Sequence, residues 1–113
     1  MSYGFVYFLT NPSMPGLVKI GMTSRHPNIR IQQLSAATAC PTKFELLAFF
    51  DFFNPAWAEA EIHKALSRYR VNDGREFFQV PLRVLQDQMR QWGDPQACYV
   101  CGRLDAMAQE EES

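Results

Sequence analysis

Residues 4–23, GFVYFLTNPSMPGLVKIGMT, decide the fold. The run from Gly4 to Leu9 is aromatic and β-branched, and it is apolar on both faces, so it predicts a central β-strand. Two prolines and a glycine between Asn11 and Gly16 cannot continue a strand and predict a turn. The run 17–23 predicts a second strand, and the short connection between the two runs favours an antiparallel hairpin.

The rest of the chain alternates between helical and extended patterns. Pro27 suits a first helical turn, and the helix should run to about residue 37, before a third strand over 43–53. Asn54 followed by Pro55 predicts the start of a helix that extends to about residue 70. A short extended piece over 75–80 and a last helix over 81–92 follow. This order predicts an α+β domain: a small central antiparallel sheet of about three strands, flanked by helices.

Composition and charge set limits on domain number and partners. The 113 residues suit one domain, expected over 1–92, and 47% of them are apolar. No signal-peptide pattern and no apolar run near ~18 residues is visible, so we expect a cytoplasmic protein without a membrane contact. Residues 1–90 hold ten Lys or Arg and seven Asp or Glu, and residues 91–113 hold one Arg and five acids. This asymmetry is compatible with nucleic-acid binding, although most asymmetries of this size are only solvated surface.

The segment 93–113 reads as an acidic tail, with residues 110–113 expected to be disordered. It contains a lone CxxC, Cys98 and Cys101, and the third cysteine is Cys40. An odd number of cysteines without a signal peptide argues against a disulfide framework. A structural zinc usually needs four ligands, and no second pair is present, so zinc is not expected.

Glu59 is the first candidate functional residue. On a wheel of the helix 55–70, Glu59 falls within about 20° of Leu66, at the margin of the apolar face. A carboxylate that points toward the sheet needs a partner, because its unpaired burial costs several kcal/mol. Glu59 is either paired with an arginine in a structural salt bridge, or it is a metal ligand or a catalytic carboxylate.

Lys19 stands among aliphatic residues in the middle of the second strand, where lysine is disfavoured. It either protects a sheet edge from aggregation or binds a ligand. Gly21 ends the same run, and a glycine there allows another backbone or a ligand to come close. Arg30, taken by itself, is an ordinary surface arginine on the first helix.

The order of these residues resembles the GIY-YIG nuclease superfamily over about residues 3–90. Phe5-Val6-Tyr7 stands where that family has its first motif, Lys19-Ile20-Gly21 stands at the second, and the helix arginine and glutamate correspond to Arg30 and Glu59. The closest resemblance is to a branch known from phage, prophage and fungal meiosis-induced proteins. Three features mark that branch: the stretch 11–23, a Glu-x-x-x-His helix at 59–63, and an Arg-Glu-Phe-Phe ending at 75–78. Lysine replaces the second tyrosine, and Asn72 is the nearest match for the family's late asparagine.

The resemblance implies a metal-dependent endonuclease that hydrolyses DNA phosphodiester bonds. It implies that Glu59 binds a single Mg²⁺ or Mn²⁺ and that Tyr7 acts as general base or orients the attacking water. Lys19 and Arg30 would clamp the phosphate beside Gly21. His63 would position Glu59 or contact DNA; the alternative is a structural histidine. One such site cuts one strand, so cleavage of both strands would need a homodimer or two visits.

Two other functions stay open at this point: a non-catalytic DNA-binding module and a protein adaptor that has lost its chemistry. The ending at 75–78 also has a structural interpretation. In it, Phe77 and Phe78 anchor the last extended piece on the core, and Glu76 pairs with Arg68 or Arg70.

Overall fold

The computed structural model describes residues 3–37, 42–71, 76–91 and 98–112. Five strands and four α-helices are formed in these ranges, with one short 3₁₀ helix, η1, after α2. In chain order they are β1 (Gly4–Thr10), β2 (Val18–Thr23), α1 (Pro27–Ala37), β3 (Glu45–Phe52), α2 (Pro55–Ala65), η1 (Ser67–Tyr69), β4 (Phe77–Phe78), α3 (Leu82–Met89), β5 (Cys98–Val100) and α4 (Leu104–Glu112).

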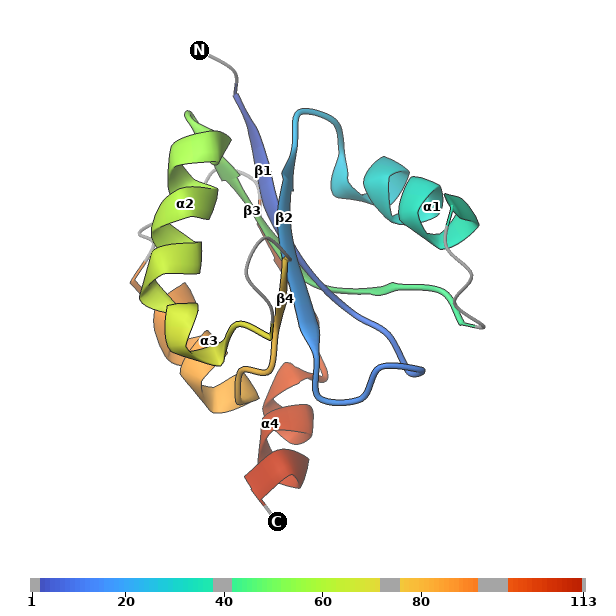
Figure 1. The fold of residues 1–113 in the computed structure, drawn as a ribbon, viewed down its shortest axis with the longest axis vertical. Helices are drawn as coiled ribbons and strands as arrows, with labels where there is room; N and C mark the ends of the chain where they lie inside the picture. The colour runs from blue at the N-terminus through green and yellow to red at the C-terminus, as the bar shows by residue number, and fades with distance from the viewer. Residues whose placement is uncertain (1–2, 38–41, 72–75, 92–97, 113) are drawn as a thin grey trace.

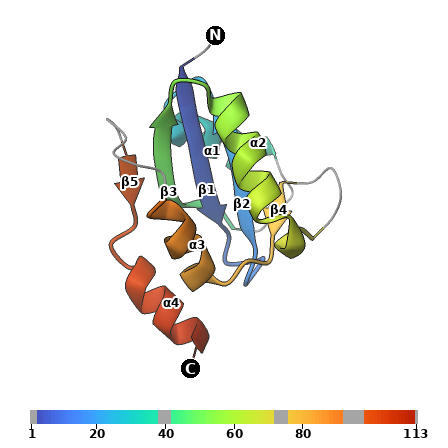
Figure 2. The same ribbon diagram turned by 90° about the vertical axis from the view of Figure 1, so that its left-hand side faces the viewer.

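The strands form one antiparallel sheet in the order β4-β2-β1-β3-β5, visible in Figure 2. β1 is the central strand and forms the predicted hairpin with β2, in which Tyr7 lies opposite Gly21. On its other side Tyr7 lies opposite Phe49 of β3. The α+β class and the central position of the first strand are therefore confirmed.

Helices cover both faces of this sheet. α2 and α3 lie on one face and α1 on the other (Figures 1 and 2). Side chains of β1 alternate between the two layers, as the twofold repeat of a strand requires. Val6 and Phe8 enter the larger core under α2 and α3, whereas Tyr7 and Leu9 enter the smaller core under α1.

α2 begins as its sequence predicts. The Asn54 side chain accepts a hydrogen bond of 3.1 Å from the Trp57 backbone N–H, and Pro55 occupies the first turn. The α-helix ends at Ala65, and η1 continues the chain to Tyr69, so the predicted single helix to residue 70 is two elements. Ala58, Ile62 and Leu66 of the predicted apolar face are buried against the sheet, whereas Ala65, predicted on the same face, is exposed.

Two strands were not counted in the prediction of about three. β4 is the short extended piece, only two residues long, and it pairs with Val18 and Lys19. β5 lies within the segment expected to be a tail and pairs with β3. Runs of two or three residues are too short to show strand periodicity, so their pairing depends on the neighbouring strand.

The expected disorder of Glu110 to Glu112 is wrong, because α4 continues to Glu112. On the inner side of α4, Leu104 and Ala108 are buried. Glu111 accepts a hydrogen bond of 2.8 Å from the Leu82 backbone N–H, and Glu112 pairs with Arg83. The acidic end of the chain is thus held by partners on α3 that composition does not reveal. None of the described helices has the length and apolarity that a membrane span requires.

Candidate functional site

Tyr7 and Gly21 form the centre of the candidate site. Tyr7 is 1% exposed, and its hydroxyl passes over the Cα atom of Gly21 on the neighbouring strand. A Cβ atom at position 21 would lie 2.4 Å from the Tyr7 hydroxyl oxygen and 3.0 Å from Oε2 of Glu76. Contacts this close do not occur between real atoms, so the glycine provides the space that the tyrosine hydroxyl occupies.

Lys19 lies on the same face of β2 as Gly21, and its side chain forms an ion pair with Glu76, which precedes the neighbouring strand β4. Its Nζ is 3.0 Å from Oε2 of Glu76, and the lysine side chain is 13% exposed. Nζ also lies 5.0 Å from the centre of the Phe77 ring. The expectation that Glu76 pairs with Arg68 or Arg70 is therefore wrong. β4 runs beside β2 and brings Glu76 next to Lys19, a neighbour that is distant in the sequence.

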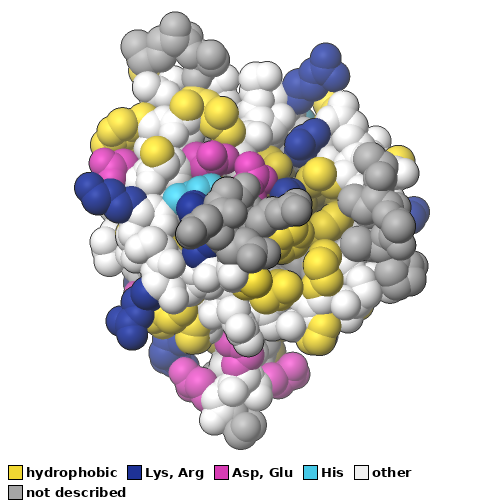
Figure 3. Space-filling model, in the orientation of Figure 1, with side chains coloured by type: hydrophobic (Ala, Val, Ile, Leu, Met, Phe, Trp, Pro, Cys, Tyr) yellow, Lys and Arg dark blue, Asp and Glu magenta, His cyan; other side chains and the backbone are white. Residues whose placement is uncertain are grey.

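Side chains from both helical layers lie near this part of β2. β4 pairs with β2 at Val18 and Lys19, and Ile20 N donates a hydrogen bond of 2.9 Å to the Glu76 backbone oxygen. Gly21 to Thr23 pair with β1 on the other side of β2, and Arg30 of α1 and Glu59 of α2 both influence the Tyr7 hydroxyl there. Figure 3 shows acidic, basic and histidine side chains gathered at this edge, beside an apolar hollow.

His63 connects α2 to this edge of the sheet. Its Nε2 lies 3.0 Å from the carbonyl oxygen of Ile20, and its Nδ1 lies 2.9 Å from an amino nitrogen of Arg70. Because a guanidinium only donates, Nδ1 accepts and the ring proton lies on Nε2, which donates to the carbonyl. Both ring nitrogens are thus used within the protein, and the histidine fixes the helix turn that carries Glu59.

Glu59 is half-buried on α2, one turn before His63, at the margin that the wheel predicted. Its carboxylate makes no hydrogen bond and no ion pair with the residues that the structure describes. Burial raises the pKa of this carboxyl above its usual value, and Glu76 raises it further. Interactions with His63, Lys19 and Arg70 lower the pKa of Glu59 without cancelling the effect of burial.

Arg30 reaches the site from α1, on the opposite layer from Glu59. Its side chain is half-buried, and it interacts with the Tyr7 hydroxyl through a hydrogen bond that stabilises the phenolate. Burial is the larger influence and raises the pKa of Tyr7; the Arg30 hydrogen bond opposes this, and the charges of Glu76 and Glu59 add to the increase. Tyr7 is therefore a neutral phenol at neutral pH.

The predicted site residues are thus brought together from four elements of the fold. We call the following set the edge cluster: Tyr7, Lys19, Gly21, Arg30, Glu59, His63, Arg70 and Glu76. The last two are functional candidates that the sequence interpretation treated as structural. The position of Glu76 in the Arg-Glu-Phe-Phe ending was the available signal for it, but nothing in the spacing distinguished Arg70 from its neighbour Arg68.

Other predicted features lie apart from the edge cluster or outside the described residues. Asn72, Cys40 and the side chain of Cys98 are not described, and Cys101 is a half-buried free thiol. In the described ranges no group of three or more His, Cys, Asp or Glu side chains is placed to hold a metal. A divalent ion that keeps most of its waters needs fewer protein ligands, and the half-buried Glu59 carboxylate, which has no partner in the part of the chain that the structure describes, fits one.

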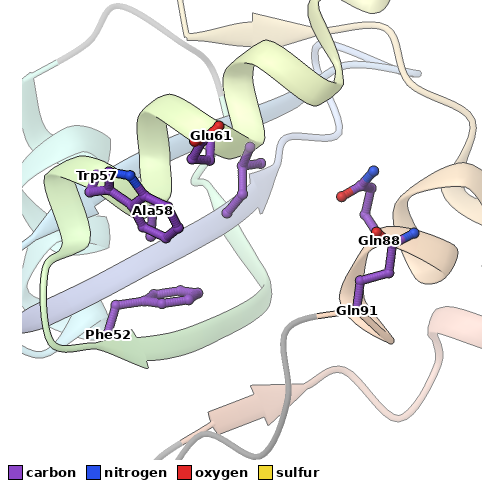
Figure 4. A pocket seen from close by; sticks show the side chains of 7 residues that line it. Phe52, Trp57, Ala58, Glu61, Gln88 and Gln91 are labelled. Carbon is purple, nitrogen blue, oxygen red and sulfur yellow. The ribbon is translucent and has the colours of Figure 1, made fainter.

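A separate cavity of about 290 Å³ lies between α2 and α3, on the face opposite Tyr7. Figure 4 shows the rings of Trp57 and Phe52 on one side of it and the amides of Gln88 and Gln91 on the other. Its one carboxylate, Glu61, is exposed, and none of the edge cluster lines the cavity. We therefore place the candidate site at the sheet edge and not in this cavity.

Comparison with known proteins identifies the family of the chain. The T5orf172 domain model matches residues 4–93, which include every residue of the edge cluster and exclude β5 and α4. The chain matches no curated protein and no solved structure. Because the match covers most of the 113 residues, the chain belongs to the T5orf172 domain family, a phage-associated family of nuclease type.

Proposed function

We propose that the protein is a metal-dependent endonuclease of the GIY-YIG type that hydrolyses DNA phosphodiester bonds. The observation that supports this most is the composition of the edge cluster. Within it, Lys19, Arg30, the Tyr7 phenol and the Glu59 carboxylate, which has no partner among the described residues, surround Gly21, although they come from both helical layers and two strands. A structural salt bridge would have paired Glu59 with an arginine, and the described residues show no such pair.

Lys19 and Arg30 are the groups that neutralise the phosphate. Hydrolysis builds negative charge on the non-bridging oxygens, so fixed cations beside them stabilise the transition state. Arg30 offers a planar guanidinium that binds two phosphate oxygens at once. Lys19 has three N–H donors, so it keeps its contact with Glu76 and still donates to a phosphate oxygen.

Tyr7 orients the attacking water and is not a phenolate base at rest. Its raised pKa keeps the hydroxyl protonated at neutral pH, although the nearby Arg30 lowers that pKa in part. Glu59 is the residue that would hold Mg²⁺ or Mn²⁺, with His63 and Arg70 fixing its helix. When bound there, such an ion would lower the pKa of its own water and stabilise the leaving oxygen.

Metal removal is the direct test of this proposal. Purified protein with supercoiled plasmid and Mg²⁺ or Mn²⁺ should convert the plasmid to the nicked form, and excess EDTA should stop the reaction. Agarose gels over a time course measure the rate. Nicking that persists in EDTA would contradict the metal requirement, and the absence of nicking with either ion would contradict the endonuclease proposal.

Arg30→Lys should reduce the nicking rate by about tenfold or more, since lysine keeps the charge and loses the two-pronged contact with the phosphate. Arg103→Lys is the matched control, because Arg103 is exposed and lies outside the edge cluster. Initial nicking rates at saturating metal compare the variants, and full activity in Arg30→Lys would disprove bidentate recognition.

The second candidate function is a DNA-binding module of the same fold without catalysis. Two features favour this module. Lys19 replaces the family's second tyrosine, and the raised pKa of Tyr7 keeps its hydroxyl protonated, so neither side chain is a general base at neutral pH. The positive excess of residues 1–90 is small, ten basic against seven acidic side chains. Binding to DNA should therefore be modest and should fall steeply with salt. A salt-dependent gel shift without nicking would favour this module, and no shift at low salt would favour an adaptor.

A further inference from the structure

A row of aromatic side chains crosses the sheet on the face that carries Tyr7. In the strand register Gly21 lies opposite Tyr7, Tyr7 opposite Phe49, and Phe49 opposite Tyr99. The Phe49 and Tyr99 rings are nearly parallel, at 21°, with their centres 6.0 Å apart. The row therefore starts in the edge cluster on β2 and β1 and continues over β3 to β5, at the far edge of the sheet.

Three further rings, from β1, the residue before it and the residue before α1, lie next to this row of aromatic side chains. Phe5 lies 5.5 Å from Phe49, Tyr3 lies 6.0 Å from Phe5, and His26 lies 5.3 Å from Phe49, measured between ring centres. We call the five rings beyond Tyr7 the aromatic surface: Tyr3, Phe5, His26, Phe49 and Tyr99.

The aromatic surface is not simply part of the core. Tyr3 is 50% exposed and Tyr99 is 41% exposed, whereas Tyr7 in the same row is 1% exposed. α1 covers Tyr7 through Ile31 and Leu34, and this helix leaves the outer rings open to solvent. Large exposed aromatic groups that adjoin one another usually mark a binding surface.

The orientation of the outermost ring is fixed before any ligand binds. The Tyr3 hydroxyl donates a hydrogen bond to Oδ2 of Asp51, a carboxylate that is buried and lies in the same sheet face opposite Phe5. A ring held in place in this way loses little conformational entropy when a ligand stacks on it.

Charge and position identify the ligand class. The aromatic surface adjoins Arg25 and Arg30, which flank His26 at the start of α1, and it begins beside the cluster that would hold a phosphate. Strands lie about 4.8 Å apart, so Tyr99 is roughly 10 Å from Tyr7, within reach of nucleotides next to that phosphate. A cationic track beside exposed aromatic rings is the arrangement that binds single strands, since unpaired bases stack on the rings.

We propose that the aromatic surface binds unpaired DNA bases adjacent to the phosphate in the edge cluster, so that single-stranded or locally unpaired DNA is the preferred substrate. The position of that phosphate rests on the proposed function, but the stacking itself does not require cleavage. Bases inside an intact duplex present no free face, so duplex DNA gains nothing from these rings. Tyr99 belongs to β5, outside residues 4–93, so the chain extends the surface beyond its family domain.

The test measures binding in EDTA, where no metal-dependent cleavage occurs. A 15-nucleotide single strand carrying 2-aminopurine and a duplex of the same length are titrated with wild-type protein, Tyr99→Ala and Tyr99→Phe. Wild-type protein should bind the single strand more tightly and change the 2-aminopurine fluorescence. Tyr99→Ala should weaken single-strand binding by about tenfold and leave duplex binding unchanged, and Tyr99→Phe should retain the wild-type affinity.

Val100→Ala is the matched control, because Val100 is 43% exposed on the same strand and its side chain points to the opposite face. It should bind both DNAs like the wild type. Tyr3→Ala is a second variant away from β5, and it should also weaken only single-strand binding. Equal losses for single strand and duplex, or no loss in either tyrosine variant, would overturn the stacking proposal. Single-strand binding that depends on Tyr99, without nicking in the metal assay, would contradict the endonuclease proposal alone.

Discussion

Glu59→Gln should reduce metal-dependent nicking of supercoiled DNA by roughly a hundredfold or more, because metal-bound charge stabilisation contributes several kcal/mol. Glutamine has the same shape as glutamate but lacks the charge that a divalent ion requires. Gel shifts in EDTA should show DNA binding within about twofold of the wild type, since the removed charge repels phosphate. Retention of wild-type nicking in this variant would reject Glu59 as the metal ligand.

The same variant should be more stable than the wild-type protein. Folding raises the pKa of the Glu59 carboxyl, so the folded state binds its proton more tightly than the unfolded state does. The wild-type protein therefore loses stability as the pH rises from the unfolded value of about 4.5 through the folded pKa. Glutamine does not titrate, so Glu59→Gln should show a higher Tm at pH 7 and a flatter dependence of Tm on pH in that window.

Glu61→Gln separates this effect from a general change of charge on α2. Glu61 is exposed on the same helix and lies outside the edge cluster. Thermal unfolding in EDTA between pH 4.5 and pH 8 compares the three proteins, and Glu61→Gln should retain both wild-type nicking and the wild-type pH dependence. A lower Tm in Glu59→Gln than in wild type at pH 7 would show that Glu59 is a structural residue.

Gly21→Ala should lower both activity and stability. The new Cβ atom would lie 2.4 Å from the Tyr7 hydroxyl oxygen and 2.6 Å from Cζ of the ring. Tyr7 is packed with Leu9 and Phe44, so the ring has no space to withdraw. Overpacking of this kind costs about 1–3 kcal/mol, and a displaced hydroxyl would reduce nicking by roughly a hundredfold.

Two comparisons identify the cause of this loss. Gly102→Ala is the matched control, because a Cβ atom at Gly102 would meet no atom within 4 Å; its Tm and nicking rate should match the wild type. Tyr7→Phe removes the hydroxyl, so adding it to Gly21→Ala should recover part of the lost stability without recovering activity. Chemical denaturation and nicking rates measure both effects. Additive free energies of unfolding in the double variant would show that the two residues do not touch.

Sequence patterns predicted the elements that depend on local chemistry. The hairpin around 4–23, the helix start at Asn54 and most of the apolar face of α2 were predicted correctly, because turn residues, capping residues and periodicity act over a few neighbours. The strand count was wrong because β4 and β5 are formed by pairing with longer strands and carry no pattern of their own.

The order of motifs along the chain also singled out Tyr7, Lys19, Arg30 and Glu59. Spacing alone left each of them with a structural explanation, since a charged residue at the margin of a helix or strand is compatible with a salt bridge. They meet beside Gly21 of β2, where the Tyr7 hydroxyl lies close to side chains from both helical layers. This meeting is set by strand register and helix docking, and no local pattern specifies it.

The sequence by itself determined the α+β class, the central strand and the residue types available for chemistry, since these follow from side-chain size, polarity and backbone preference over short distances. Only the tertiary structure decided the partners. It paired Lys19 with Glu76, joined His63 to Arg70, left the Glu59 carboxylate without a partner among the described residues, and aligned Tyr7, Phe49 and Tyr99 in one row. The physical reason is that these contacts join residues far apart in the chain, and sheet register and helix docking set them.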